Sequence, residues 1–225
     1  MFRHLASACF VTTILGFGAS AASAGTTFVA DLSNGAENPP AVPTTTTDDP
    51  RPASFGTATF FLNDAQTSLT FTAFVQNIDF TGTQTPDIND NLTVTHIHAG
   101  PLVTAATNGP VVWGFFGQPF NETDPNDQVV TPLQSGVGGT ISGKWDLTEG
   151  NNTTLDAQLD NLLEGRAYIN FHTEQFDGGE VRGNIRVSAQ VIPLPPALLT
   201  GLIGLGMVGV RPMWRAVRER IKTNK

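Results

Sequence analysis

The side chains best suited to chemistry are three histidines, His96, His98 and His172. His96 and His98 are separated by one residue, so on a β-strand their imidazoles point to the same face. Two imidazoles on one face can share a metal ion, and His172, in another expected strand, can supply a third ligand. Neutral imidazole nitrogens favour copper or zinc. The sequence therefore predicts a copper or zinc site at these three residues.

The stretch around His172, residues 167–187, is expected to form a β-hairpin with a loop over 173–179. Residues at alternate positions of a strand point to opposite faces of the sheet. One register puts every apolar residue of the hairpin on one face and every polar residue on the other, which is how register is fixed in a half-buried sheet. The apolar face would hold Ala167, Ile169, Phe171, Val181, Ile185 and Val187. The pairs that this register predicts are His172 with Glu180, Asn170 with Arg182, and Tyr168 with Asn184.

The polar face of the hairpin allows two interpretations. Glu180 or Arg182 would orient His172 beside a bound metal, because ligating histidines are commonly held by an outer hydrogen bond. Alternatively, the polar side chains form a hydrogen-bonded clasp across the strands without any metal. The residues that either interpretation involves are Tyr168, Asn170, Glu180 and Arg182.

Other catalytic chemistries lack their residues. The only cysteine, Cys9, lies in the N-terminal segment, so thiol nucleophiles and cysteine-rich metal sites are excluded from the rest of the chain. The glycine-rich stretch 136–139 lacks the Lys-Ser/Thr of a phosphate-binding loop. No serine has the flanking glycines of a nucleophile elbow. No catalytic residue is assigned, and an enzymatic activity is not expected.

The N-terminus has the pattern of a secretory signal peptide. A short basic start, Met1–His4, precedes the apolar run Leu5–Gly18, and Ala22-Ser23-Ala24 provides a small-residue cleavage site. Residues 1–24 are therefore predicted to be removed on export.

The C-terminus has the pattern of a membrane segment followed by a basic tail. A proline motif around 192–196 precedes an apolar run over 194–210, and the following residues carry four arginines and two lysines. The run is short for a full span, for which about 20 residues are usual, but it is apolar on all sides and is predicted to form a single transmembrane helix. Its basic end is expected to stay on the cytoplasmic side. Residues 191–225 resemble the PEP-CTERM sorting signal of Gram-negative bacteria. That resemblance implies an exosortase-type processing enzyme as a partner, transient anchoring in the inner membrane, and delivery to the periplasm, cell surface or extracellular matrix.

The remaining chain is strongly acidic. Between residues 25 and 192 it carries five bases and 19 acids, a formal charge of −14. Such a domain does not bind nucleic acid by neutralising phosphates. It must also fold without disulfides, on core packing alone.

The order of expected elements favours an all-β fold. Strands are expected over 26–32, 55–62, 69–75, 92–101, 109–116 and 139–147, followed by the hairpin. Only 153–165 shows helical spacing, with leucines on one side and Gly165 as a stop. Residues 118–135 are expected to be a long surface excursion. Many short strands separated by Gly and Pro are typical of an antiparallel, Greek-key-like β-sandwich, here one domain over 26–190.

Several motifs follow one another along this domain. They are Glu37-Asn38-Pro39-Pro40, Gly56-Thr57-Ala58, His96-Ile97-His98-Ala99-Gly100, Gly109-Pro110-Val111-Val112, and Tyr168–Thr173 followed by Gly178–Gly183. In this order they resemble the CHRD (chordin-type) domain. The match spans roughly residues 28–187, with an aromatic Phe171 at a position where aliphatic residues are common, and with insertions at 44–52 and 118–135. The resemblance implies an extracellular β-sandwich module without an established enzymatic activity.

Two functions are open from the sequence. The first is an exported binding or structural module that acts through the His/Glu/Arg face and has an extracellular ligand that the sequence does not identify. The second is a copper or zinc metalloprotein at His96, His98 and His172. A His-x-His pair on an antiparallel strand is similar to copper–zinc superoxide dismutase, which would suggest redox chemistry, but a fold-level likeness does not transfer an activity.

Overall fold

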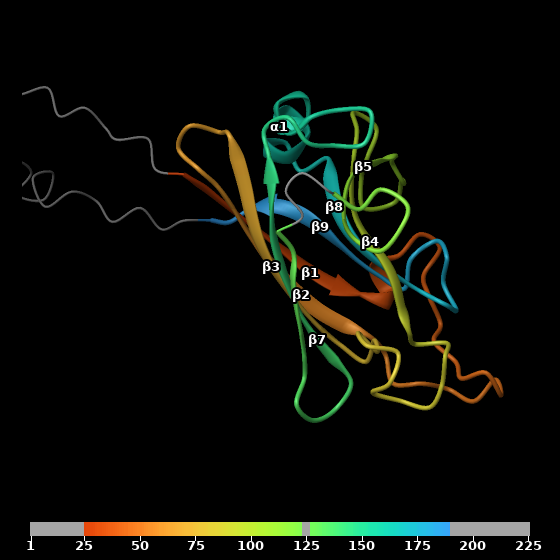
Figure 1. Ribbon diagram of the computed structural model, residues 1–225. Helices are drawn as coiled ribbons and strands as arrows, with labels where there is room; N and C mark the ends of the chain where they lie inside the picture. Colours follow the sequence, from red (N-terminus) through yellow and green to blue (C-terminus); the bar gives the residue numbers. More distant parts are fainter. Residues whose placement is uncertain (1–24, 123–126, 190–225) are drawn as a thin grey trace, which may run out of the picture. The chain divides into compact units, whose positions relative to one another are not determined.

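The computed structural model describes residues 25–122 and 127–189 of the chain (Figure 1). These residues form an almost entirely β structure with one short α-helix. In chain order the strands and the helix are β1 (Thr26–Ser33), β2 (Phe55–Leu62), β3 (Ser68–Gln76), β4 (Leu92–Ala99), β5 (Val111–Phe116), β6 (Val129–Pro132), β7 (Gly138–Asp146), α1 (Leu155–Leu163), β8 (Ala167–Thr173) and β9 (Val181–Val187). A 3₁₀ turn, Asn34–Ala36, follows β1.

The strands form a single sheet in the order β5-β4-β8-β9-β1-β2-β3-β7-β6. Each neighbouring pair is antiparallel. The sequence predicted a two-sheet sandwich, whereas the structure has one continuous sheet that curls. The continuity arises because β9 pairs with β8 on one side and with β1 on the other, which leaves no break in the hydrogen bonding.

The curl brings strands that are distant in the sheet order together around a common core. Phe71 on β3 contacts Phe115 on β5 with ring centroids 4.5 Å apart, and Trp113 on β5 stacks on Trp145 of β7 at 5.4 Å. All four rings are at least 96% buried. Aromatic pairs at such distances add packing energy beyond the area that they bury. The two halves of the curled sheet thus pack face to face.

The hairpin of β8 and β9 has the predicted register. Asn170 pairs with Arg182 and Tyr168 with Asn184, while Phe171 pairs with Val181. Phe171, Val181 and Ile185 are fully buried, which confirms the apolar face over most of its length. Val187, at the end of β9, is 47% exposed, contrary to the prediction.

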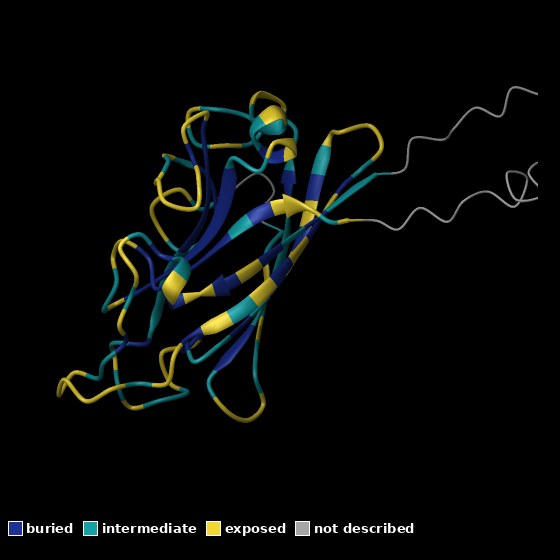
Figure 2. Cartoon of the chain, turned by 180° about the vertical axis from the view of Figure 1, so that it is seen from behind, coloured by how far each residue is buried: buried dark blue, intermediate teal, exposed yellow. Residues whose placement is uncertain are grey.

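The opposite, polar face of this hairpin is also buried, contrary to the half-buried sheet that the alternation predicted. All seven residues of β8 are buried, whereas β2 alternates between exposed and buried positions (Figure 2). The cause is a cover of loops. Segments near residues 104–109 and 173–180 hydrogen-bond to side chains on the outer face of β8 and β9.

Two elements in the second half of the chain complete the fold. Helix α1 is capped by Thr154, whose hydroxyl accepts from Ala157 N, and it buries Leu155 and Leu162 against the core. The predicted surface excursion contains an additional short strand, β6, which pairs with β7. Strand β6 has only four residues, and these alternate between exposed and intermediate burial. So short a strand without a buried face does not show the apolar–polar alternation by which a strand is recognised in a sequence.

The two predicted targeting segments, 1–24 and 191–225, lie outside the described residues. Within residues 25–122 and 127–189, the structure contains no helix with the length and apolar character needed to cross a membrane. The first and last described strands are adjacent, because Phe28 pairs with Val187 and Ser188 N donates to Thr27 O at 2.8 Å.

Candidate metal centre

The three histidines lie on the outer face of two neighbouring strands. His96 and His98 are on β4 and His172 is near the end of β8. In the ladder between these strands His96 is opposite Asn170, and His172 is opposite Val94, two residues before His96. Pairing of β4 with β8 therefore places His172 diagonally next to His96 on one face.

The imidazoles meet at ligand-like distances. One ring nitrogen from each residue lies within 4.8 Å of those from the other two. Nδ1 of His96 is 3.3 Å from Nε2 of His172. Two nitrogens bound tetrahedrally to one zinc at about 2.0–2.1 Å lie about 3.3 Å apart, so this pair already has the spacing of two ligands.

The outer nitrogen of each ring faces a backbone carbonyl. Nδ1 of His172 is 2.8 Å from the Asp177 carbonyl, Nδ1 of His98 is 2.9 Å from that of Gly109, and Nε2 of His96 makes a longer contact of 3.4 Å with that of Pro119. A carbonyl can only accept, so the nitrogen that faces it carries the proton. The inner nitrogens are then unprotonated and carry lone pairs. They are Nδ1 of His96 and Nε2 of His98 and His172. Ligating histidines have this arrangement, with the tautomer fixed by an outer hydrogen bond.

Burial keeps these rings neutral. The three histidines are 4–8% exposed. Burial, followed by the proximity of His172, lowers the pKa of His96 to about 4. Burial is also the main cause that lowers the pKa of His98 to about 4 and that lowers the pKa of His172. Neutral imidazole is the form that binds metal, so these ligands need not lose a proton at neutral pH.

A stack of side chains supports His98. Its ring lies parallel to that of Tyr168, with centroids 4.6 Å apart and an interplanar angle of 5°. The Arg182 guanidinium carbon is 3.6 Å from the centroid of the same tyrosine ring, a cation–π distance. Because β8 lies between β4 and β9 in the sheet, His98 and Arg182 reach Tyr168 from opposite sides. The stack restricts the rotation of the imidazole.

Arg182 connects this stack to the covering loop. Its guanidinium is fully buried and donates to Oδ1 of Asn108 at 2.7 Å and to the carbonyls of Thr104 and Thr107 at 2.6 and 3.2 Å. The buried Glu37 is close enough for its negative charge to raise the pKa of Arg182, against the larger lowering effect of burial. Burial raises the pKa of Glu37 to about 7, while the positive charge of Arg182 opposes that rise.

Glu180 does not join the histidines. Its fully buried carboxylate forms a salt bridge with Arg51 at 2.8 Å, accepts from Oγ1 of Thr173 at 2.7 Å, and also accepts from the Ser54 hydroxyl. Glu180 therefore attaches the loop 43–54 to the hairpin. The carbonyl of Asp177 has the orienting position beside His172 that the sequence suggested for Glu180 or Arg182.

Asn170 lies between the histidines and the hairpin loop. Its amide nitrogen donates to the Gly178 carbonyl at 3.3 Å, and its buried Oδ1 has no hydrogen-bond partner. Gly179 has a φ of +120°, and a Cβ there would come within 2.4 Å of the Asn170 amide. Glycine at 179 is thus required for this loop to close over Asn170.

The sequence comparison with family signatures decides the assignment of this fold. Residues 28–185, most of the chain, match the CHRD domain. The chain belongs to the CHRD domain family. No curated protein and no solved structure gives a comparable match.

Several residues of this CHRD domain that matter at the centre could not be found from sequence. The carbonyls of Gly109, Pro119 and Asp177 are backbone groups, and any residue type would provide them. Glu37 begins the stretch Glu37-Asn38-Pro39-Pro40 noted in the sequence, yet its position near Arg182 depends on how the loop after β1 folds back.

Proposed function

We propose that this CHRD domain is a metal-binding module that holds one copper or zinc ion through Nδ1 of His96 and Nε2 of His98 and His172. The observation that carries the proposal is Nε2 of His98. This atom is buried and has no hydrogen-bond partner, and it belongs to the group in which all three imidazoles come together. A buried nitrogen without a partner costs free energy, and a shared cation would remove that cost for all three rings.

A bound ion would keep a position open to other ligands. Among the described residues no fourth His, Cys, Asp or Glu belongs to the group. Three protein ligands with a free position are typical of zinc sites that bind water or substrate rather than of closed structural sites. Because the histidines are only 4–8% exposed, only small molecules could reach this open position.

The second candidate is the hydrogen-bonded clasp, which the contact of His96 with His172 favours. If Nδ1 of His96 carried the proton, it would donate to Nε2 of His172 at 3.3 Å and the pair would be satisfied without metal. That tautomer would turn a lone pair of His96 towards the Pro119 carbonyl and would still leave His98 Nε2 without a partner. The metal accounts for all three rings, and the clasp accounts for two.

Titration of the purified, chelator-treated protein with Cu(II) and Zn(II) tests the proposal. We expect one ion per chain in the wild type. His98→Gln and His172→Ala should each weaken binding by more than the roughly 10–100-fold that is typical for loss of an outer hydrogen-bond partner. Tyr168→Phe is the matched control, because it keeps the stacked aromatic ring and removes only the phenolic hydroxyl. Equal affinity in the wild type and His98→Gln would favour the clasp.

We also propose that the module acts outside the inner membrane, on the strength of the two terminal segments and the acidic charge. A reporter fused after Ile192 should be active in the periplasm, whereas a reporter fused after Lys225 should stay cytoplasmic. Periplasmic activity of the Lys225 fusion would contradict the proposed sorting signal and its exosortase-type partner.

A further inference from the structure

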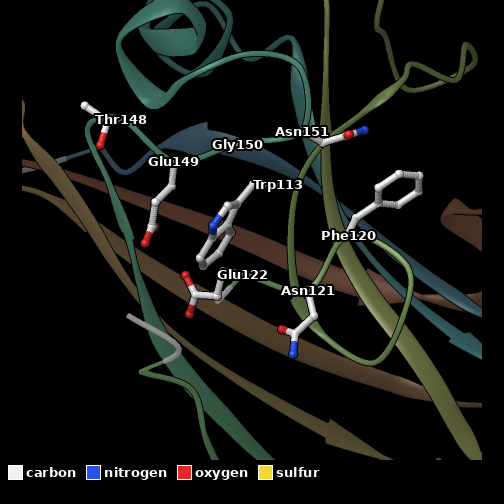
Figure 3. Close-up of a pocket in the computed structure, with 8 residues that line it drawn as sticks. All are labelled: Trp113, Phe120, Asn121, Glu122, Thr148, Glu149, Gly150 and Asn151. Atoms are coloured by element: carbon white, nitrogen blue, oxygen red, sulfur yellow. The ribbon is translucent and has the colours of Figure 1, made fainter. Parts of the chain in front are cut away.

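A separate cavity of about 380 Å³ lies where the curl of the sheet brings β5 close to the end of β7. We call this region the seam. One wall is the segment beside β5, where Glu122 N donates to the Gly114 carbonyl at 3.0 Å. The other wall is the turn after β7, which is attached to β5 by Asn151 N donating to the Val112 carbonyl at 2.7 Å. The residues that line the cavity include Trp113, Asn121, Glu122 and Glu149 (Figure 3).

The cavity contains an excess of oxygen acceptors without donors. In the part of the chain that the structure describes, both carboxylate oxygens of Glu122, Oε1 of Glu149 and Oδ1 of Asn121 are buried without a well-formed hydrogen bond, although the Asp127 backbone N–H and the Glu149 carboxylate lie close enough to Glu122 to influence its pKa. Glu122 is only 7% exposed. The Glu122 and Glu149 carboxylates are directed into the same part of the cavity (Figure 3). Buried acceptors of this kind are stabilised by a hydrogen-bond donor, a proton or a cation, and these four oxygens outnumber the unpaired donors of the cavity.

Glu149 is held in place for such a role. Its second carboxylate oxygen, Oε2, accepts from Asp146 N at 2.8 Å, and its backbone carbonyl accepts from the Trp145 indole at 2.8 Å. Both contacts leave Oε1 free. The side chain is therefore fixed before any ligand arrives, which lowers the entropic cost of binding.

An independent observation also indicates a ligand here. The Trp113 indole Nε1–H is buried and has no acceptor, in a residue that is 1% exposed. Its nitrogen-bearing edge is turned towards the two carboxylates (Figure 3). Buried tryptophan N–H groups usually find a partner. A water molecule held in the cavity would accept a hydrogen bond from this N–H group.

We infer that the cavity binds a hard divalent cation, with Ca²⁺ as the best fit, through the oxygens of Glu122, Glu149 and Asn121. Ca²⁺ takes six to eight oxygen ligands, of which several can be waters. A cavity of about 380 Å³ is larger than a bare ion and leaves room for such waters, each of which occupies about 30 Å³ in the liquid. One of these waters would accept the Trp113 N–H, so the proposed ion with its hydration shell would satisfy every unpaired group.

The electrostatics are consistent with a missing positive charge. Burial, followed by the negative charges of Glu149 and Asp127, raises the pKa of Glu122 to about 8. Burial also raises the pKa of Glu149. Without a cation, a proton reduces the repulsion between the two carboxylates, so Ca²⁺ binding would displace that proton.

This site is independent of the histidine centre in its chemistry. Carboxylate and amide oxygens select calcium, whereas imidazole nitrogens select copper or zinc. The failure of one proposal therefore leaves the other intact.

Calorimetric titration of the full-length, chelator-treated chain with Ca²⁺, and with Mg²⁺ in parallel, tests the inference. We expect one Ca²⁺ per chain, tighter than Mg²⁺, and proton release in buffers of different ionisation enthalpy. Glu122→Gln and Glu149→Gln should each weaken binding at least about tenfold, while Glu149→Asp should give a smaller loss. Glu174→Gln, which removes the charge of an exposed acid, should leave the Ca²⁺ affinity unchanged.

Terbium luminescence gives a second readout that does not depend on heat. Tb³⁺ occupies calcium sites and is sensitised by a neighbouring indole, so emission should appear in the wild type and decrease on addition of Ca²⁺. Trp113→Phe should reduce the sensitised emission. No Ca²⁺ binding at millimolar concentration in the wild type, or equal Ca²⁺ affinity in the wild type and Glu122→Gln, would overturn the inference.

Discussion

At the scale of single residues, the outer face of the hairpin depends on groups that are charged or polar and yet buried. Arg182 is fully buried, stacked on Tyr168, and donates to three acceptors of the loop 104–108. The same stack holds the His98 ring in place. A buried charge is tolerated only when its partners are present, so the stability of the domain and the orientation of His98 rest on the same contacts.

Replacing Arg182 tests this dependence. Arg182→Met should lower the free energy of unfolding by about 3–5 kcal/mol, because the acceptors in the loop lose a buried charged partner. Arg186→Met, which removes an exposed arginine that pairs with Asp31, should cost less than about 1 kcal/mol. Urea denaturation measures both changes. Equal losses of unfolding free energy in the two variants would show that the buried contacts of Arg182 stabilise the domain no more than an exposed ion pair does.

Glu122 predicts a pH dependence of stability. Its pKa is about 8 in the folded state, against 4.5 for an unperturbed glutamate, so between these values the folded chain holds a proton that the unfolded chain has released. Raising the pH through this window should therefore lower the free energy of unfolding, by less than about 1.4 kcal/mol per pH unit. Denaturation curves in calcium-free buffer should show this slope in the wild type and a smaller one in Glu122→Gln. An unchanged slope in the variant would assign the effect to another group.

At the scale of elements, strand β8 is central because it is buried on both faces. Its apolar residues face the core and its polar residues lie beneath loops. Alternation in the sequence predicted the register of β8 with β9, since only one register separates apolar from polar side chains. The burial of the polar face could not be predicted, because it is caused by loops that are distant in sequence and have no periodicity. The positions of Glu180 and Arg51 illustrate this point, since 129 residues separate them.

Phe171 tests the core face of this element. Its ring is fully buried and lies 6.2 Å from that of Phe115 and 6.4 Å from that of Phe80. Phe171→Ala should destabilise the domain by about 3–5 kcal/mol through the cavity that it leaves. Phe61→Ala, at a phenylalanine that is 46% exposed, should change stability by about 0.5 kcal/mol or less. Similar thermal shifts for the two variants would contradict the observed packing.

At the scale of the whole molecule, one curled sheet creates two separate sets of unpaired groups. The outer face of β4 and β8 gathers imidazole nitrogens, and the seam between β5 and β7 gathers carboxylate oxygens. The His-x-His spacing and the polar face of the hairpin pointed to the first set from the sequence. Nothing pointed to the second, because Glu122 and Glu149 are 27 residues apart in segments without a strand pattern, and only the closure of the sheet brings them together.

The most direct test of the metal centre is X-ray absorption at the metal edge of protein reconstituted with one equivalent of Zn(II). Three imidazole ligands at about 2.0–2.1 Å are expected, recognised by the outer-shell scattering of their ring atoms, with water or an exogenous ligand in the fourth position. His98→Gln should lose the outer-shell scattering of one imidazole. A spectrum without imidazole scattering, or zinc that is removed entirely by gel filtration, would contradict a centre built on His96, His98 and His172.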